Sequence, residues 1–116
     1  MRTAELAGIH TLFIEAEGAP ISVANDVIGD AWSVEAALIV IPVERLDPAF
    51  FDLSSLVAGE FLQKIVNYRL RVAIVGDIAR FTESSGALRD FVWESNRGTQ
   101  VWFVDDEAAL EGRLAP

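Results

Sequence analysis

Residues 36–41 (AALIVI) and residues 70–75 (LRVAIV) decide the fold of this chain. The first segment is apolar throughout, and the second is rich in branched side chains. Continuous apolar runs of this kind are typical of strands that are covered on both faces. Pro42 ends the first run, and Gly76 with Asp77 closes the second. We therefore predict two buried strands.

Further strands are expected around this pair. Residues 3–7 and 9–15 predict a hairpin that turns at Gly8, and residues 100–104 predict the last strand. Strands that alternate with helices pair in parallel through right-handed crossovers. The expected element order is β-β-α-β-α-β-α-β-α. We predict one α/β domain over residues 1–116, with a single-layer mixed, mostly parallel sheet and packed helices.

The first two helices are predicted where apolar residues recur at helical spacing. Residues 22–31 form the first helix, and Ser22 is its expected N-cap. Residues 53–68 form the second helix, whose wide apolar arc requires burial against the sheet.

Two more helices follow in the second half of the chain. Ser84 or Ser85 is expected to cap a third helix that ends at Arg97. Gly98 is expected to take the left-handed conformation that commonly ends a helix. Residues 105–107 are acidic and open a final helix at its positive end.

Composition excludes several chemistries. The chain has no cysteine, which removes disulfides, thiolate nucleophiles and thiolate zinc sites. Its one histidine, His10, lies in an apolar strand-like run, so we expect a surface or sheet-edge histidine and not a catalytic one. One histidine cannot supply a multi-histidine metal site. We accordingly expect no metal and no cofactor.

Charge and hydropathy narrow the range of partners. Acidic residues outnumber basic ones by 18 to 9, and the formal net charge is −9. Because this charge repels phosphate backbones and anionic lipid heads, we expect neither nucleic acid nor membrane as a partner. The longest apolar run, residues 36–43, is far shorter than the roughly 20 residues that cross a bilayer. The first residues lack the pattern of a signal peptide, so we expect a cytoplasmic protein.

A series of short motifs runs through the second half of the chain. The motifs are FFDL at 50–53, AGEFLQK at 58–64, NY at 67–68, AIVGD at 73–77, LRDF at 88–91, ESNRG at 94–98 and FV at 103–104. This ordered series closely resembles a bacterial family catalogued as domain of unknown function 4180. The family tends to show a basic residue, Thr and Gly where this chain has residues 54–56 (SSL). The resemblance implies no established activity, but it directs attention to the polar motif residues.

The element order also resembles that of anti-sigma-factor antagonist domains, the STAS or SpoIIAA-like fold. Those domains carry a phosphorylatable serine where a helix begins after a strand, and residues 52–55 (DLSS) partly match that motif. The resemblance implies phosphorylation of Ser54 or Ser55. The alternative is that their hydroxyls only cap the second helix.

The second helix carries a polar stripe. Glu60, Gln63 and Asn67 follow one another at i, i+3 and i+7, beside Gly59. The stripe is either a solvated face or a binding surface. Glycine in mid-helix costs about 0.5–1 kcal/mol relative to alanine, so we expect another helix or a partner chain to approach Gly59 closely.

Asp77 follows the second buried strand. In open α/β sheets, ligands gather beyond the carboxyl ends of the strands. The Asp77 carboxylate therefore either binds a ligand there or caps the next turn.

The third helix carries aromatic and basic residues away from its expected core face. That core face consists of Leu88, Phe91, Val92 and Ser95. Arg89, Trp93 and Arg97 are spaced i, i+4, i+8, and Trp93 lies well off the core face. Arginine can stack on Trp93 at the surface, or the group can form a protein contact, most simply self-association. Asn96 would then lie on the polar rim of that contact.

Two functions fit these observations. The first is a regulatory or protein-interaction module that binds another protein or itself. The second is a small-molecule-binding protein or enzyme that uses Glu60, Asp77, Arg89 and Asn96. Nucleotide-binding and serine-hydrolase motifs are absent, which favours a role without catalysis. A deep enclosed pocket holding these groups would favour the second function, and a flat patch centred on an aromatic residue would favour the first.

Overall fold

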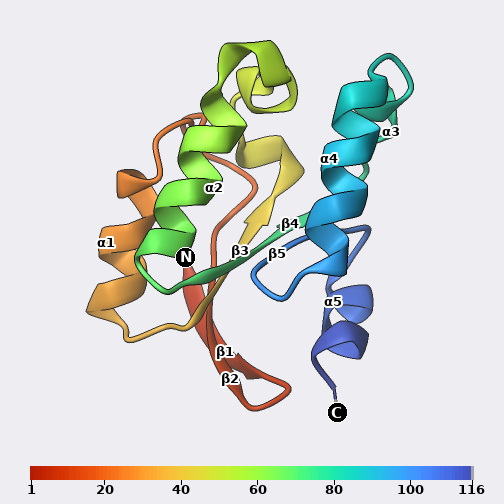
Figure 1. Ribbon diagram of the computed structural model, residues 1–116. Helices are drawn as coiled ribbons and strands as arrows, with labels where there is room; N and C mark the ends of the chain where they lie inside the picture. The colour runs from red at the N-terminus through yellow and green to blue at the C-terminus, as the bar shows by residue number, and fades with distance from the viewer. Residues whose placement is uncertain (116) are drawn as a thin grey trace.

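A computed structural model describes residues 1–115 and shows a single sheet with the strand order β1-β2-β3-β4-β5 (Figure 1). The first two strands form the predicted hairpin and pair antiparallel. The remaining neighbours pair in parallel, which confirms the mixed, mostly parallel sheet. The strands are β1 (Arg2–Leu6), β2 (Ile9–Phe13), β3 (Leu38–Pro42), β4 (Arg71–Val75) and β5 (Val101–Val104).

The two apolar segments that decide the fold lie inside the sheet. Strand β3 pairs with β2 on one side and β4 on the other, and Leu38 is opposite both Thr11 and Arg71. Leu38 and Ile39 point to opposite faces, and both are 0% exposed. The continuous apolar sequence of β3 follows from this burial on both faces.

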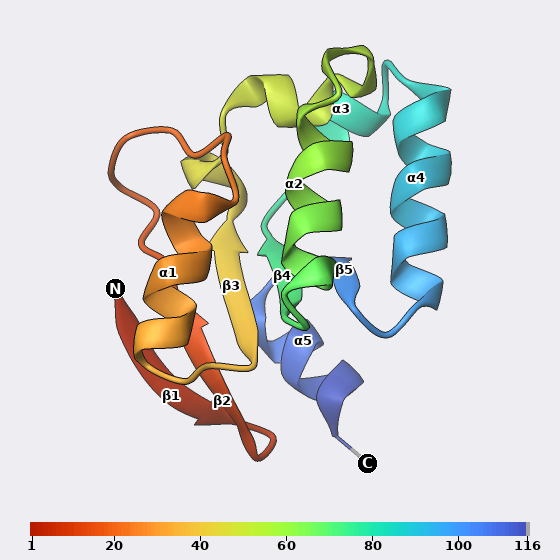
Figure 2. The ribbon, with the colours of Figure 1, turned by 60° about the vertical axis from the view of Figure 1, so that its left-hand side comes forward.

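Three helices cover one face of the sheet and stand side by side in Figure 2. They are α1 (Asn25–Ser33), α2 (Val57–Asn67) and α4 (Gly86–Arg97). Parallel strands that follow one another in sequential order through right-handed crossovers place every connecting helix on the same face. Val27, Phe61 and Leu88 accordingly contribute to one core cluster with Ile39 and Ile74. Among residues 1–115, no helix is long and apolar enough to cross a membrane.

The opposite face of the sheet is covered by one short helix, α5 (Glu107–Leu114). Leu110 is 0% exposed and belongs to a second cluster with Leu38, Val40 and Trp102. The face gains further cover at its margin from Arg113, whose guanidinium lies 5.5 Å from the centre of the Trp102 ring. Arg2 covers Phe13 on the same face, with its guanidinium 4.0 Å from the ring centre, so α5 shares the cover of this face with the hairpin.

Helix starts differ from the expectation at two places. Ser22 does not cap α1, because Ile21 is still extended and forms a bridge with Leu46. The N-cap is Ala24, which makes no side-chain hydrogen bond. Helix α2 begins at Val57, since the preceding residues form a separate 3₁₀ helix, Leu53–Ser55.

Helix ends differ as well. The expectation for Gly98 was wrong: its φ of −89° and ψ of −168° are extended, so the chain leaves α4 directly toward β5. The left-handed ends occur instead at Glu35 after α1 and Arg69 after α2, with φ of 58° and 61°. Of the two serines predicted to cap α4, Ser85 is the N-cap. Its hydroxyl accepts a 3.1 Å hydrogen bond from the Leu88 amide.

Elements that the sequence did not predict are short. Helix α3 (Ala79–Thr82) precedes α4, and two 3₁₀ helices, Val43–Arg45 and Pro48–Phe51, follow β3. All of them lie beyond the carboxyl ends of strands, where they shape the edge of the sheet described below.

Replacing Leu110 by alanine tests the role of α5. We expect a loss of about 2–5 kcal/mol in the free energy of unfolding, because a fully buried leucine leaves a cavity over β3 and β5. Urea denaturation measures the change. Leu56→Ala is the matched control, since it removes the same atoms from a side chain that is 64% exposed. Equal losses in the two variants would contradict the assignment.

Candidate functional site

Hollows beside two of the helices open at the edge where the parallel strands end. One lies between the ends of β4 and β5 and helix α4, with a volume of about 320 Å³. The other lies between the ends of β2 and β3 and helix α1, with a volume of about 400 Å³. We call them the α4 hollow and the α1 hollow. Both lie beyond the carboxyl ends of parallel strands, the end of the sheet at which open α/β sheets bind their ligands.

The α4 hollow brings together several residues that the sequence singled out. Arg89, Trp93 and Asn96 line it from α4, and its apolar floor includes Val92 and Phe103. Trp93 is 61% exposed, which confirms that it lies off the core face. Trp93 thus forms an exposed aromatic rim on a hollow that is only partly enclosed.

Arginine stacking occurs on Trp93, as expected, but only one arginine provides it. The Arg97 guanidinium lies 4.6 Å from the centre of the Trp93 ring and 3.4 Å from a Glu94 carboxylate oxygen. The Arg89 guanidinium instead donates a 2.6 Å hydrogen bond to the Thr82 carbonyl. Arg89 therefore ties α3 to α4, and Arg97 holds the indole in place.

Asn96 has a structural role that the sequence did not indicate. Its amide oxygen accepts a 2.7 Å hydrogen bond from the Phe103 backbone amide, and its amide nitrogen donates a 3.1 Å bond to the Phe103 carbonyl. Strand β5 is the last in the sheet, so these backbone groups face outward. Asn96 imitates a neighbouring strand at this position, and its side-chain polar atoms are occupied.

Asp77 caps a turn. Its carboxylate accepts a 2.8 Å hydrogen bond from the Ala79 amide at the start of α3. The residue is exposed and does not line either hollow. The capping alternative accounts for its position.

The polar stripe of α2 lies apart from both hollows. Glu60, Gln63 and Asn67 are exposed, and Gln63 donates a 2.9 Å hydrogen bond to Asn67. The expectation that another helix approaches Gly59 was wrong, because a Cβ added there would meet no atom of residues 1–115 within 4 Å. The stripe continues to Tyr68, which lies edge-to-face against Trp32, with ring centres 5.6 Å apart.

The two candidate phosphorylation sites lie in the 3₁₀ helix before α2. The Ser54 hydroxyl donates a 2.6 Å hydrogen bond to Asp52, whose carboxylate caps this helix. The Ser55 hydroxyl donates to the Ala49 and Asp52 carbonyls and accepts a 3.2 Å bond from the Val57 amide. These contacts give both hydroxyls a local structural role, and their phosphorylation stays a prediction.

His10 is a surface strand residue, as expected. It lies in β2, and its side chain is 38% exposed. Its Nδ1 atom is 3.2 Å from a carboxylate oxygen of Glu5 on β1. The pair sits on the hairpin, outside both hollows.

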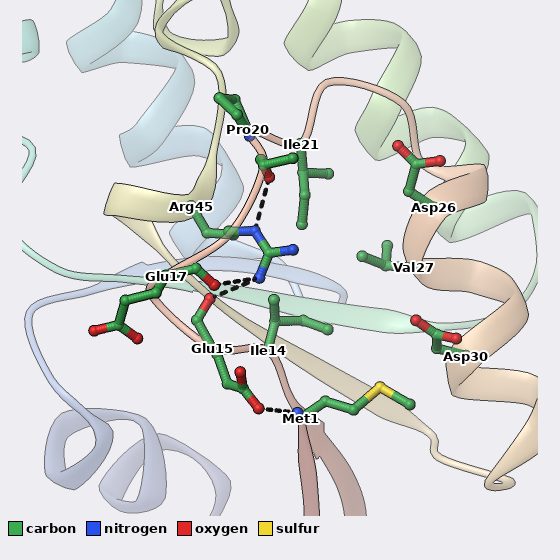
Figure 3. Close-up of a pocket in the computed structure, with 11 residues that line it drawn as sticks. Met1, Ile14, Glu15, Glu17, Pro20, Ile21, Asp26, Val27, Asp30 and Arg45 are labelled. Carbon is green, nitrogen blue, oxygen red and sulfur yellow. Dashed lines mark hydrogen bonds and ion pairs between the residues drawn. The ribbon is translucent and has the colours of Figure 1, made fainter.

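The α1 hollow was missed by the sequence reasoning. Figure 3 shows Arg45 in its centre, held by three backbone carbonyls. Its Nε donates to Ala19 at 2.8 Å, and its Nη1 donates to Glu15 and Glu17 at 3.1 and 3.0 Å. Gly18 lies against the guanidinium, with a φ of 140°, and a Cβ there would overlap the Arg45 guanidinium carbon. The loop between β2 and α1 is thus built around Arg45.

Carboxylates line the α1 hollow on two sides. Glu15 pairs with the Met1 α-amino group, which holds the pKa of that carboxyl below its usual value. Asp26 and Asp30 face the hollow from α1, one turn apart (Figure 3). Among residues 1–115, neither of these aspartates takes part in an ion pair.

One signal in the sequence could have identified this hollow. Arg45 is the only Lys or Arg between Arg2 and Lys64, within a strongly acidic stretch. An isolated cation in such a stretch is positioned for a specific contact. Gly18, which packs against the guanidinium, lies in a segment whose sequence predicts only a loop. Its contact with Arg45 could therefore not be predicted.

The fold and these two hollows define a small α/β domain with concave surfaces beside α1 and α4 at the carboxyl edge of its sheet. A family model described as Domain of unknown function (DUF4180) matches residues 7–114, and the chain belongs to this family. No curated protein and no solved structure matches the chain, so the resemblance to STAS domains stays a prediction. Within the described residues, no cluster of histidines and carboxylates could hold a metal ion.

Asn96→Ala tests the bond to the β5 edge. We expect the Phe103 amide to exchange with solvent deuterium about tenfold faster or more, because it loses its only side-chain acceptor. Hydrogen exchange followed by NMR reports this amide directly. Asn67→Ala is the control, because it removes an asparagine that bonds only Gln63 on the surface. Unchanged Phe103 exchange in Asn96→Ala would contradict the role given to Asn96.

Gly18→Ala tests the packing of the loop on Arg45. We expect a loss of about 1–3 kcal/mol in the free energy of unfolding, from the strained φ and from displacement of the guanidinium. Gly8→Ala provides the comparison: Gly8 has a φ of 82°, but no atom lies within 4 Å of its added Cβ. A smaller loss for Gly18→Ala than for Gly8→Ala would show that the guanidinium does not restrict this position.

Proposed function

We propose that this chain is a protein-interaction module that self-associates through α4, with Trp93 at the centre of the contact. The observation that carries the proposal is the exposed position of Trp93, 61% accessible on the rim of the α4 hollow. A large aromatic side chain gains several kcal/mol when an interface buries it, and tryptophan and arginine are enriched at interface centres.

The state of the neighbouring polar groups favours a protein contact over a polar ligand. Asn96 is occupied by the β5 backbone, and Arg89 is tied to the Thr82 carbonyl. Each group thus already serves the fold, although further N–H donors of Arg89 and one N–H of Asn96 have no partner among residues 1–115. An apolar or aromatic side chain would rest on the floor formed by Val92 and Phe103 without displacing them.

The local charge favours a second copy of the chain as the partner. A formal net charge of −9 opposes association between copies over most of the surface. On the exposed part of α4, however, Arg89 and Arg97 are balanced by Asp90 and Glu94. This region is therefore suited to face an identical surface.

A two-fold contact would let both copies use the same surface. In such an interface the same patch is used on each subunit. The Trp93 ring of each copy would then cover the α4 hollow of the other copy. Arg97 supports this arrangement, because it holds the indole in a defined position before the contact forms.

The cytoplasmic location expected from the sequence stays a prediction beside this proposal.

Trp93→Ala tests the proposal. We expect the wild-type chain to dimerise and the variant to bind itself at least about 30-fold more weakly, as for a residue at the centre of an interface. Sedimentation equilibrium over a range of protein concentrations measures the dissociation constant.

Trp32→Ala is the matched control for this measurement. Trp32 is 59% exposed, close to the value for Trp93, but it lies at the opposite edge of the sheet beside Tyr68. We expect this variant to dimerise like the wild type. A monomeric wild-type chain, or a dimer that Trp93→Ala leaves intact, would overturn the proposal.

A further inference from the structure

We propose that the α1 hollow binds a small aliphatic amino acid, whose carboxylate contacts Arg45 and whose ammonium group lies between Asp26 and Asp30. This site is independent of the contact proposed for α4. It lies at the ends of β2 and β3, whereas the α4 hollow lies at the ends of β4 and β5.

The hydrogen bonds of Arg45 leave one edge of its guanidinium free. An arginine side chain carries five N–H donors, one on Nε and two on each terminal nitrogen. The Nε donor and both Nη1 donors are bound to loop carbonyls. Within the described chain, Nη2 makes no hydrogen bond, and Figure 3 shows it directed into the hollow between Ile14, Ile21 and Val27.

The Arg45 guanidinium makes no direct ion pair among residues 1–115, although it joins the Met1 α-amino group in lowering the pKa of Glu15. Its bound groups are neutral carbonyls. Because the guanidinium is anchored by three bonds and by Gly18, it has little freedom to turn toward the carboxylates around it. A ligand carboxylate at Nη2 would supply a direct anionic partner through a strong, charge-assisted hydrogen bond.

Two carboxylates face this cation across the hollow. Asp26 and Asp30 lie one turn apart on α1, so their side chains share the face that borders the hollow (Figure 3). Two unpaired carboxylates at this spacing repel one another mildly, and a ligand ammonium between them would relieve that repulsion. The hollow thus presents a cationic donor on one wall and anionic acceptors on the other.

The surface between the charged walls is apolar. Ile14, Ile21 and Val27 line it and are themselves almost completely buried, so they form a rigid floor. A volume of about 400 Å³ falls in the range of small-ligand pockets. A zwitterion with a short aliphatic portion matches all three features, whereas a purely anionic ligand would be repelled by the aspartates and a purely cationic one by Arg45.

The experiment uses the intact chain and two probes that differ in the distance between their charges, L-leucine and 5-aminopentanoate. Two-dimensional NMR follows the amide of Gly18 and the amides and methyl groups of Ile21 and Val27 during titration. We expect one of the two probes to shift these signals with saturation. The single-charge analogues 4-methylpentanoate and 3-methylbutylamine test whether both charges are needed, and each should bind at least about tenfold more weakly.

Charge removal on α1 identifies the ammonium site. The double variant Asp26→Asn, Asp30→Asn keeps the shape of both side chains, and we expect it to weaken binding of the zwitterion about tenfold or more. Glu111→Gln, on the exposed surface of α5 and outside both hollows, is the control and should bind like the wild type. Arg45 itself is left unchanged because it holds the loop together.

Three results would overturn the proposal. They are the absence of saturable shifts at these residues with both probes, equally tight binding of either single-charge analogue, and full affinity in the double aspartate variant. The dimer measured with Trp93→Ala is a separate readout, so failure of one proposal leaves the other standing.

Discussion

The handedness of the crossover connections is the constraint on which the rest of this structure depends. Strands β2 to β5 follow one another in sequential order, so each right-handed crossover places its helix on the same face. The carboxyl ends of these strands all meet one edge, and the gaps beside α1 and α4 become the two hollows. The same constraint leaves the opposite face to α5, which explains why Leu110 must be fully buried.

Side chains that satisfy the backbone shape both hollows. Arg45 donates hydrogen bonds to the carbonyls of a loop that has no regular structure. Asn96 forms hydrogen bonds with the amide and the carbonyl of Phe103 in the last strand. Buried or half-buried backbone groups require such partners. The two residues differ in which polar atoms lack a hydrogen bond. The oxygen and the nitrogen of the Asn96 amide each make one, whereas Nη2 of Arg45 makes none within residues 1–115 and is directed into its hollow. A similar structural task therefore leaves different polar atoms exposed to the two hollows.

The sequence predicted the features that depend on burial and periodicity. The apolar runs gave β3 and β4, and helical spacing placed Trp93 outside the core. Features that depend on tertiary contacts were not predictable. Ser22 is an ordinary capping residue, but the bridge between Ile21 and Leu46 keeps the chain extended there. Gly59 suggested a close approach that the described chain does not make. The contact between Gly18 and Arg45 joins segments that are distant in the sequence, and no local sequence pattern predicts it.

The pairing of Asn96 with Phe103 also limits how this chain can aggregate. A bare edge strand is a template on which another polypeptide can add a strand, and this addition is a common first step toward fibrils. Asn96 occupies the outward amide and carbonyl at the middle of β5, so that template is interrupted. A strand from another molecule would have to displace Asn96 before it could pair along the whole of this edge.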